Sequence, residues 1–185
     1  MTQSLNSCAP IESPKPPMPL TKSDLLTLLA DLGLQASTIE HPPLHTVEEA
    51  QSWRGTLPGG FCKNLFLKDK RGELWLIVTL ENRKIRLNQL PKALGSARLS
   101  FASADLMWEV LGVRPGSVTP FALANDTDQR CHLVLDAPML DFSTLNYHPL
   151  TNEATTTIST QDFLKFVHHC GHEPLIIDLE AAAGV

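Results

Sequence analysis

Two short stretches of the chain place chemically capable polar side chains among residues typical of β-strands. Lys63 lies between apolar residues in the stretch 61–67. The stretch 148–158 begins with His148 and continues with an amide side chain and several hydroxyls. Polar groups are costly to bury unless they are partnered, and their neighbours here favour β-structure. The two stretches therefore predict a shared polar pocket for an anionic or hydroxylated ligand.

Lys63 has two interpretations. At the end of a buried strand, its ammonium could be a point charge for a phosphate or a base with a lowered pKa. Alternatively, the side chain could extend from a strand edge with its ammonium in water. The residues alone leave both open.

His148 precedes Pro149, which holds the histidine backbone extended. Its imidazole could shuttle a proton or orient a neighbouring group through one ring nitrogen. The structural alternative is a hydrogen-bonded core histidine. Thr151 and Asn152 would then serve a turn, and the threonines that follow would simply favour a strand.

A glycine and a proline occur at fixed offsets in the stretch 116–121, which reads Gly116-Ser117-Val118-Thr119-Pro120-Phe121. A loop of this kind lets the backbone approach a ligand closely. An ordinary turn before a strand over residues 118–123 explains the same residues.

Neither metal nor cofactor chemistry is indicated. His168, His169 and His172 lack an accompanying ligand at a suitable spacing, and Gly171 interrupts the helix between them. Phosphate-binding, dinucleotide-binding and serine-hydrolase motifs are absent from the sequence. Cys62 has no evident partner base, so a buried thiol is the better interpretation.

Charge is segregated along the chain. The 185 residues carry a net charge of −5, yet residues 63–98 contain nine basic and three acidic side chains. Such a segment could bind phosphates, or its lysines could be solvated on surface strands and turns. The sequence has no apolar run long enough to cross a membrane and no secretory signal. Four widely spaced cysteines indicate free thiols and a cytoplasmic protein.

The order of predicted elements indicates an α+β fold. Residues 1–17 are rich in proline and predict a disordered tail, and residues 18–185 predict a single domain. Periodicity and capping residues predict helices near 21–32, 46–50, 90–94, 103–111 and 160–169. Strands are predicted near 39–41, 60–68, 74–80, 85–87, 99–102, 118–123, 132–136, 155–159 and 174–178. Many short strands with interspersed helices predict a mixed, strongly curved sheet.

Four of these motifs in series resemble the YbaK-type aminoacyl-tRNA editing family, whose domain is also inserted in bacterial prolyl-tRNA synthetases. The motifs are residues 63–69, 116–121, 148–156 and 171–174, and the resemblance spans about residues 18–179. The first and third look closest to the free-standing branch that deacylates Ala-tRNA(Pro). The sequence shows no synthetase catalytic core, so such a protein would act in trans.

The resemblance implies a barrel-like curved sheet with flanking helices and hydrolysis of the ester between a mischarged amino acid and tRNA, without a cofactor. It assigns catalysis to Lys63, Gly116 and His148, with Lys63 holding the terminal phosphate or aligning the ester. Substrate contacts fall on Asn64, which would also support Lys63, and on Ser117, Thr119, Pro120, Phe121, Thr151 and Asn152. The basic segment then becomes a tRNA-facing surface of Lys68, Lys70, Arg71, Arg83, Lys84 and Arg86.

Other functions compete with Ala-tRNA(Pro) deacylation. Within the family, the substrate could be Cys- or Ser-tRNA. From a different class, the chain could be a non-catalytic module that binds tRNA or a synthetase, or it could act on small aminoacylated molecules. The resemblance implies as partners the acceptor end of mischarged tRNA(Pro) and prolyl-tRNA synthetase, and neither DNA nor a membrane.

Overall fold

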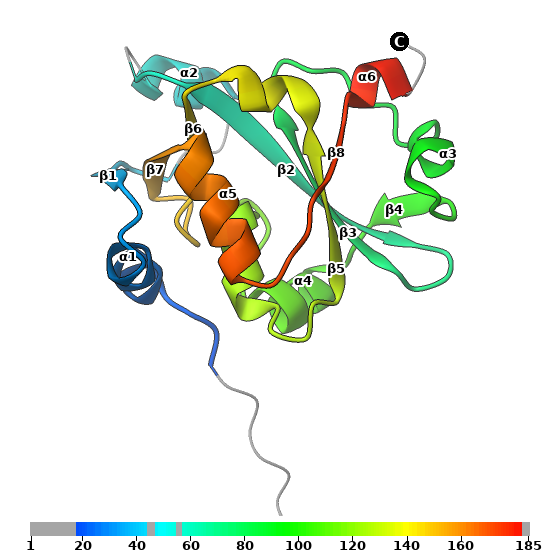
Figure 1. Cartoon of the computed structure of the whole chain (residues 1–185), viewed down its shortest axis with the longest axis horizontal. Coiled ribbons are helices and arrows are strands. Elements are labelled where there is room, and N and C mark those ends of the chain that lie inside the picture. Colours follow the sequence, from blue (N-terminus) through cyan, green and yellow to red (C-terminus); the bar gives the residue numbers. More distant parts are fainter. Residues whose placement is uncertain (1–17, 44–46, 55–56, 183–185) are drawn as a thin grey trace, which may run out of the picture.

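A strand with apolar side chains on both faces lies at the centre of the structure. In this computed structural model, which describes residues 18–43, 47–54 and 57–182, strand β3 (Leu74–Leu80) is buried at six successive positions. Alternate side chains of a strand point to opposite faces. Continuous burial therefore requires a layer on each side of the sheet (Figure 1).

The remaining elements follow one another in an α+β order. The other strands are β1 (Ala36–Glu40), β2 (Gly60–Asp69), β4 (Leu99–Phe101), β5 (Cys131–Asp136), β6 (Thr144–Tyr147), β7 (Ala154–Ser159) and β8 (Leu175–Ile177). The α-helices are α1 (Lys22–Asp31), α2 (Val47–Arg54), α3 (Leu90–Leu94), α4 (Ala104–Leu111), α5 (Thr160–His169) and α6 (Leu179–Ala182). Two 3-10 helices, η1 and η2, span Pro120–Asn125 and Ala137–Asp141.

The eight strands form one mixed sheet in the order β1-β7-β6-β2-β3-β5-β8, with β4 paired to β2 off this path. Strand β2 pairs antiparallel with β3 along one edge, from Cys62 to Lys68. Along its other edge it pairs in parallel with β6 at Gly60 and Phe61, and antiparallel with β4 at residues 67–69. Among the described strands, β1 and β8 each pair on one side only.

Two apolar clusters cover the two faces. Helices α1, α4 and α5 pack with η1 against one face, which includes Leu76 and Val78 of β3. Helices α3 and α6 pack against the other face, with Trp75 and Ile77. Figure 1 shows α3 and α6 together at one end of the sheet, away from α5. Burial of these large side chains is the main stabilising term of the fold.

Short polar signals set the helix ends. Thr21 and Asp24 form a reciprocal capping box at α1, and Ser103 and Ser159 cap α4 and α5 through their hydroxyls. Gly112 ends α4 in the left-handed conformation. These are the ends at which the sequence analysis placed the three helices.

The structure confirms the mixed α+β class but not a barrel, because the path of described strands is open. The strand predicted at 118–123 is wrong, since Pro120 begins the 3-10 helix η1 there. The strand predicted at 85–87 is also wrong, because these residues lie in an irregular connection. Strand β6 and helix α6 were not predicted. The predicted tail and the capping residue Thr46 lie outside the described residues.

Two glycines with nearly equal backbone angles give a test of how tightly β2 packs beside β6. Gly59 and Gly72 have φ of +97° and +96°. A Cβ on Gly59 would lie 2.4 Å from Thr144 Oγ1, whereas one on Gly72 would meet nothing within 4 Å. We expect Gly72→Ala to cost about 1–2 kcal/mol from backbone strain alone. Gly59→Ala should cost ~1–3 kcal/mol more from overpacking.

Denaturant unfolding of both variants beside the parent chain measures this difference. Equal losses in the two variants would contradict the close approach of the strands at Gly59.

Candidate functional site

Strand β2 changes partners along one edge, and the change leaves a gap. After Phe61 its pairing with β6 ends, and pairing with β4 begins only at Leu67. Among the described strands, none pairs with this edge at residues 62–65, and the Phe66 carbonyl accepts from the Ala102 amide directly after β4. The segment before η1 reaches this part of β2, because Asn64 donates from Nδ2 to the Val118 carbonyl at 2.9 Å. The gap is where polar side chains gather.

A small cavity of about 90 Å³ lies beside this gap. It takes its lining from α2, β2, β6 and β7 and from the residue after β6. The lining residues are Trp53, Arg54, Phe61, Cys62, Asn64, Asn146, Tyr147, His148 and Thr155. Of the residues singled out from the sequence as catalytic or substrate-binding, Asn64 and His148 line it.

Asn64 Oδ1 is a buried polar atom of the cavity lining with no hydrogen-bond partner among the described residues. The buried Tyr147 hydroxyl has no partner there except the Cys62 thiol. The Tyr147 hydroxyl lies beside the Cys62 thiol, and burial raises the pKa of both groups, that of Cys62 to about 12. Buried polar atoms without partners are uncommon and call for an explanation. In a cavity lining they mark positions where a ligand or a water can bind.

His148 lies directly after β6, with its ring in the cavity lining. Its Nδ1 is 3.3 Å from the Ala154 carbonyl, which can only accept a hydrogen bond. In the neutral ring Nδ1 therefore carries the proton, and Nε2 keeps its lone pair. Burial lowers the pKa of His148, with smaller effects from His41 and Arg54 in the same direction. The neutral form is thus favoured near pH 7.

Contacts of His41 and Asn146 brace the cavity. His41 packs against Trp53 with ring centroids 4.3 Å apart, and its Nε2 lies 3.0 Å from Thr155 Oγ1. Asn146 donates to the Pro58 and Gly60 carbonyls and accepts from Thr157 at 2.6 Å. These contacts hold the start of β2 against β6 and β7.

A cation lies at the rim. The Arg54 guanidinium is 4.2 Å from the centre of the Phe61 ring and forms an ion pair with Glu81. Stacking and pairing together fix the direction of the guanidinium. The sequence analysis did not single out Arg54.

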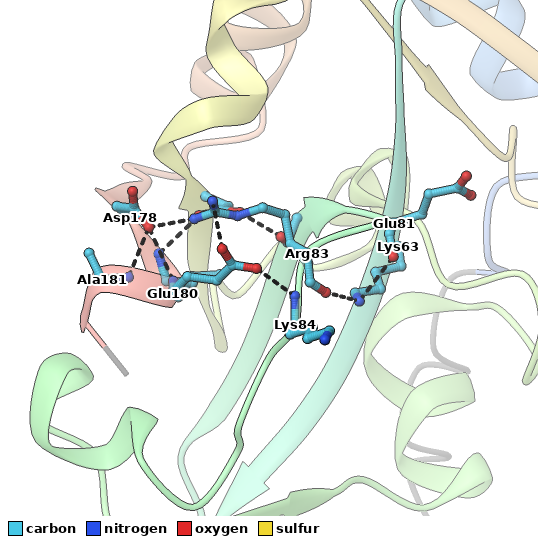
Figure 2. Close-up of polar contacts among 10 residues, drawn as sticks. Lys63, Glu81, Arg83, Lys84, Asp178, Glu180 and Ala181 are labelled. Carbon is cyan, nitrogen blue, oxygen red and sulfur yellow. Dashed lines mark hydrogen bonds and ion pairs between the residues drawn. The ribbon is translucent and has the colours of Figure 1, made fainter. Parts of the chain in front are cut away.

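Lys63 points to the face of β2 opposite to Asn64. Adjacent residues of a strand alternate, so Lys63 shares the face of Leu65, which packs with α3 and α6, whereas Cys62 packs on the α5 face. Its ammonium donates to the carbonyls of Glu81, at 3.1 Å, and Arg83 (Figure 2). Burial lowers the pKa of Lys63, against the raising effect of nearby carboxylates. Lys63 and Asn64 therefore bind different partners among the described residues, and support of Lys63 by Asn64 stays a prediction.

Lys63 nevertheless lies close to the cavity, because its neighbours in β2, Cys62 and Asn64, both line it. Glu81 accepts from Lys63 through its backbone carbonyl and binds Arg54 through its side chain. Because the β2 edge is unpaired here, groups from both faces of the strand border the same gap.

The segment 116–121 supports the cavity from behind rather than lining it. Gly116 is exposed with φ +91°, and Ser117, Thr119 and Pro120 are buried. Phe121 is fully buried and packs edge-on against Tyr147 with ring centroids 5.6 Å apart. The Thr119, Pro120 and Phe121 side chains do not belong to the cavity lining, and their contact with a substrate stays a prediction.

Thr151 and Asn152 lie in the turn between β6 and β7. Thr151 Oγ1 accepts from the Glu153 amide at 3.3 Å, and Leu150 adopts φ +63°. This is turn chemistry, and neither side chain belongs to the cavity lining.

The basic segment divides into two groups. Lys68, Lys70, Lys84 and Arg86 are exposed, and Arg71 is exposed but anchored to Asp69 and the Gly95 carbonyl. Arg83 differs, because its guanidinium binds Asp136, Asp178 and Glu180 and is largely buried. Three carboxylate partners already bind the Arg83 guanidinium, and its role on the tRNA-facing surface stays a prediction.

Sequence reasoning missed Trp53, Arg54, Asn146, Tyr147 and Thr155 of the lining. Polar and apolar side chains alternate in residues 144–147, directly before His148. This alternation was the available signal for β6, and β6 places Asn146 and Tyr147 beside His148.

The described part of the chain contains no group of three or more His, Cys, Asp and Glu side chains that could hold a metal ion, and no helix in it is long and apolar enough to cross a membrane.

Comparison with known proteins gives consistent matches. The family model described as "Aminoacyl-tRNA editing domain" matches residues 41–166. The "Prolyl-tRNA synthetase associated domain-containing protein 1" of Bos taurus is 42% identical over 157 residues, covering 82% of this chain and 91% of that protein. The "Prolyl-tRNA editing protein ProX" of Acetoanaerobium sticklandii is 33% identical, covering 85% and 97%.

A solved structure shows the same fold. The crystal structure of the hypothetical protein APE2540 superposes with a TM-score of 0.68 at 20% identity, covering 86% of this chain and 99% of that one.

Burial of His148 predicts a pH dependence of stability. Its pKa is lowered in the folded state, so the unfolded chain binds a proton more readily as the pH falls below about 6.5. The free energy of unfolding should therefore decrease between pH 7 and pH 5. His148→Gln should reduce this slope, whereas His169→Gln, at an exposed position of α5, should leave it unchanged. Denaturant unfolding across that pH range is the measurement, and equal slopes for the parent and His148→Gln would contradict the burial.

Proposed function

The chain belongs to the aminoacyl-tRNA editing domain family, and we propose that it hydrolyses the ester of alanine mischarged onto tRNA(Pro), acting in trans. The observation that carries the proposal is the small polar cavity beside the unpaired edge of β2, with Asn64 Oδ1 unpartnered in its lining. The names of the two relatives refer to prolyl-tRNA synthetase and to prolyl-tRNA editing, which supports the choice of tRNA(Pro).

The size of the cavity supports a small amino acid. Its volume is only about 90 Å³. A synthetase site built for proline cannot strongly exclude alanine, because a few methylene groups are worth only about 1–3 kcal/mol. A second site that accepts alanine and rejects the proline ring would complete a double sieve.

The reaction needs little acid–base power, since an aminoacyl ester is already activated. Water attacks the carbonyl carbon, the bond to the ribose oxygen breaks, and the products are the free amino acid and the tRNA hydroxyl. The proton that water loses is balanced by the proton that the ribose oxygen gains. Positioning of the ester and donors for the developing oxyanion can then supply the rate.

In this proposal each polar group has a role. Asn64 Oδ1 accepts from the α-ammonium of the amino acid, and His148 Nε2 accepts from the attacking water. Lys63, on the other side of the β2 edge, holds the terminal phosphate or aligns the ester. Gly116 and Ser117 offer backbone groups at the gap, and Thr151 and Asn152 shape the turn that carries His148.

The acceptor stem would lie along the β2–β3 hairpin. Strands rise about 3.4 Å per residue, so Lys68 lies roughly 14 Å along β2 from Asn64 and the hairpin tip lies beyond it. This spacing suits phosphates of the stem rather than the terminal nucleotide. We propose Lys68, Lys70 and Arg71 for this contact, with Lys84 and Arg86 as further candidates. A cytoplasmic location and contact with prolyl-tRNA synthetase follow from the substrate.

The first test is single-turnover deacylation of Ala-tRNA(Pro), with Pro-tRNA(Pro) and Ala-tRNA(Ala) as controls. We expect rapid loss of alanine from the first substrate only. Lys63→Ala should lower the rate about 10²–10³-fold, the usual cost of removing one transition-state donor. Lys165→Ala removes an exposed lysine of α5 and should leave the rate unchanged.

Faster hydrolysis of Cys- or Ser-tRNA(Pro) than of Ala-tRNA(Pro) would identify cysteine or serine, rather than alanine, as the amino acid that is removed. Binding of tRNA without ester loss would establish a non-catalytic module instead. Unfolding of Lys63→Ala, seen by circular dichroism, would assign Lys63 a structural role.

A second test addresses the tRNA-facing surface. The double variant Lys68→Glu, Lys70→Glu should weaken tRNA binding and lower the slope of log affinity against log salt by about 2. The rate of the bound complex should remain unchanged, because the hairpin lies away from the cavity. Lys165→Glu is the matched control. Unchanged affinity of the double variant at physiological salt would place the tRNA elsewhere.

A further inference from the structure

A polar cluster behind Lys63 connects this residue to the C-terminal helix (Figure 2). Asp136, at the end of β5, is fully buried and accepts from Thr79 Oγ1 at 2.6 Å, from the Leu179 amide and from Arg83. A buried carboxylate must be paired to be tolerated. Arg83 is its cationic partner, and this pairing fixes the place of residue 83 beside the sheet.

The Arg83 guanidinium also binds helix α6 and Asp178, the residue directly before that helix. Its guanidinium binds Asp178 as well as Glu180, the latter at 3.0 Å. Asp178 in turn accepts from the amides of Glu180 and Ala181. Glu180 is therefore held beside the connection that follows β3.

One peptide group in that connection is fixed at both ends. The amide of Lys84 donates to Glu180 Oε1 at 2.7 Å, and the carbonyl of Arg83 accepts from the Lys63 ammonium. These two atoms belong to the same peptide unit. In a planar trans peptide the N–H and C=O groups point in opposite directions. By holding the N–H, Glu180 directs the carbonyl toward Lys63.

We propose that Glu180 is a positioning residue for Lys63, acting through the Arg83–Lys84 peptide. The inference rests on the role of Lys63 in the proposed function and adds the C-terminal helix to the active machinery. Without the carboxylate the peptide can rotate, the ammonium loses one of its two carbonyl partners, and Lys63 no longer keeps a single direction. Misplacement by about 1 Å can cost roughly 10²-fold in rate.

The pair Glu180→Ala and Glu180→Gln separates this role from a simple ion pair. Both variants remove the charge that faces Arg83, but the glutamine oxygen can still accept from the Lys84 amide. We expect Glu180→Ala to lower the single-turnover rate about 10²-fold with tRNA affinity unchanged, and Glu180→Gln to restore most of the rate. Glu109→Ala, which removes a surface ion pair with Arg130, is the matched control.

A second readout does not depend on activity. The ¹⁵N NMR signal of the Lys63 ammonium, assigned by its loss in Lys63→Arg, should be visible at low temperature in the parent chain and in Glu180→Gln. It should broaden or disappear in Glu180→Ala, because the ammonium protons then exchange faster with water. Should the parent chain hydrolyse no aminoacyl-tRNA, the proposed function fails, while this signal still tests the positioning.

Two results would overturn the inference. One is an unchanged signal and rate in Glu180→Ala. The other is an equal loss in the Gln and Ala variants, which would assign the effect to the charge rather than to the peptide. Because Glu180 is partly exposed, we expect both variants to fold.

Discussion

The site depends on the change of partners along one edge of β2. A strand edge carries backbone groups that need partners, and β2 satisfies them first with β6 and then with β4. Between these pairings the described strands leave residues 62–65 open on that edge. The rest of the site follows from this gap. Polar side chains in the middle of a long strand become reachable there, and the segment before η1 and the end of β6 meet beside it.

The alternation of side chains along β2 then divides the site in two. Asn64 faces the cavity with Tyr147 and His148, whereas Lys63 faces the cluster of Arg83, Asp136 and Glu180. Glu81 joins the halves, since its backbone binds Lys63 and its side chain binds Arg54 at the rim. A substrate at the gap could thus contact a neutral imidazole and amide on one side and a cation on the other. The cation is held by backbone carbonyls, so it keeps its charge free for a phosphate or an ester oxygen.

Local signals were sufficient for much of the fold. Capping residues such as Thr21 and Ser159, the turn at Gly72 and the apolar run of β3 predict their elements because each is decided within a few residues of sequence. The site was predicted only in part. Lys63, Asn64 and His148 stand out because each is polar in an apolar setting. Their grouping could not be derived, since the pairing of β2 with β6 joins residues about 85 positions apart.

Two differences between the local sequence pattern and the structure have the same physical origin. Residues 85–87 alternate like a strand, but Leu87 and Ile85 pack against the apolar cluster under α3 and α6 without a strand partner. Arg83 looked like a surface cation because its three carboxylate partners come from β5 and the C-terminal segment. In both cases long-range packing decided the outcome, and local composition carried no sign of it.

The most direct test of the account is where a substrate analogue binds. In 3′-alanylamino-3′-deoxyadenosine an amide replaces the ester, so the analogue should bind without being hydrolysed. A crystal structure of the complex should place the alanyl group in the cavity, against Asn64 and His148, with the nucleoside crossing the open edge of β2 toward Lys63. Binding of the alanyl group elsewhere, with the cavity filled by water, would contradict the account.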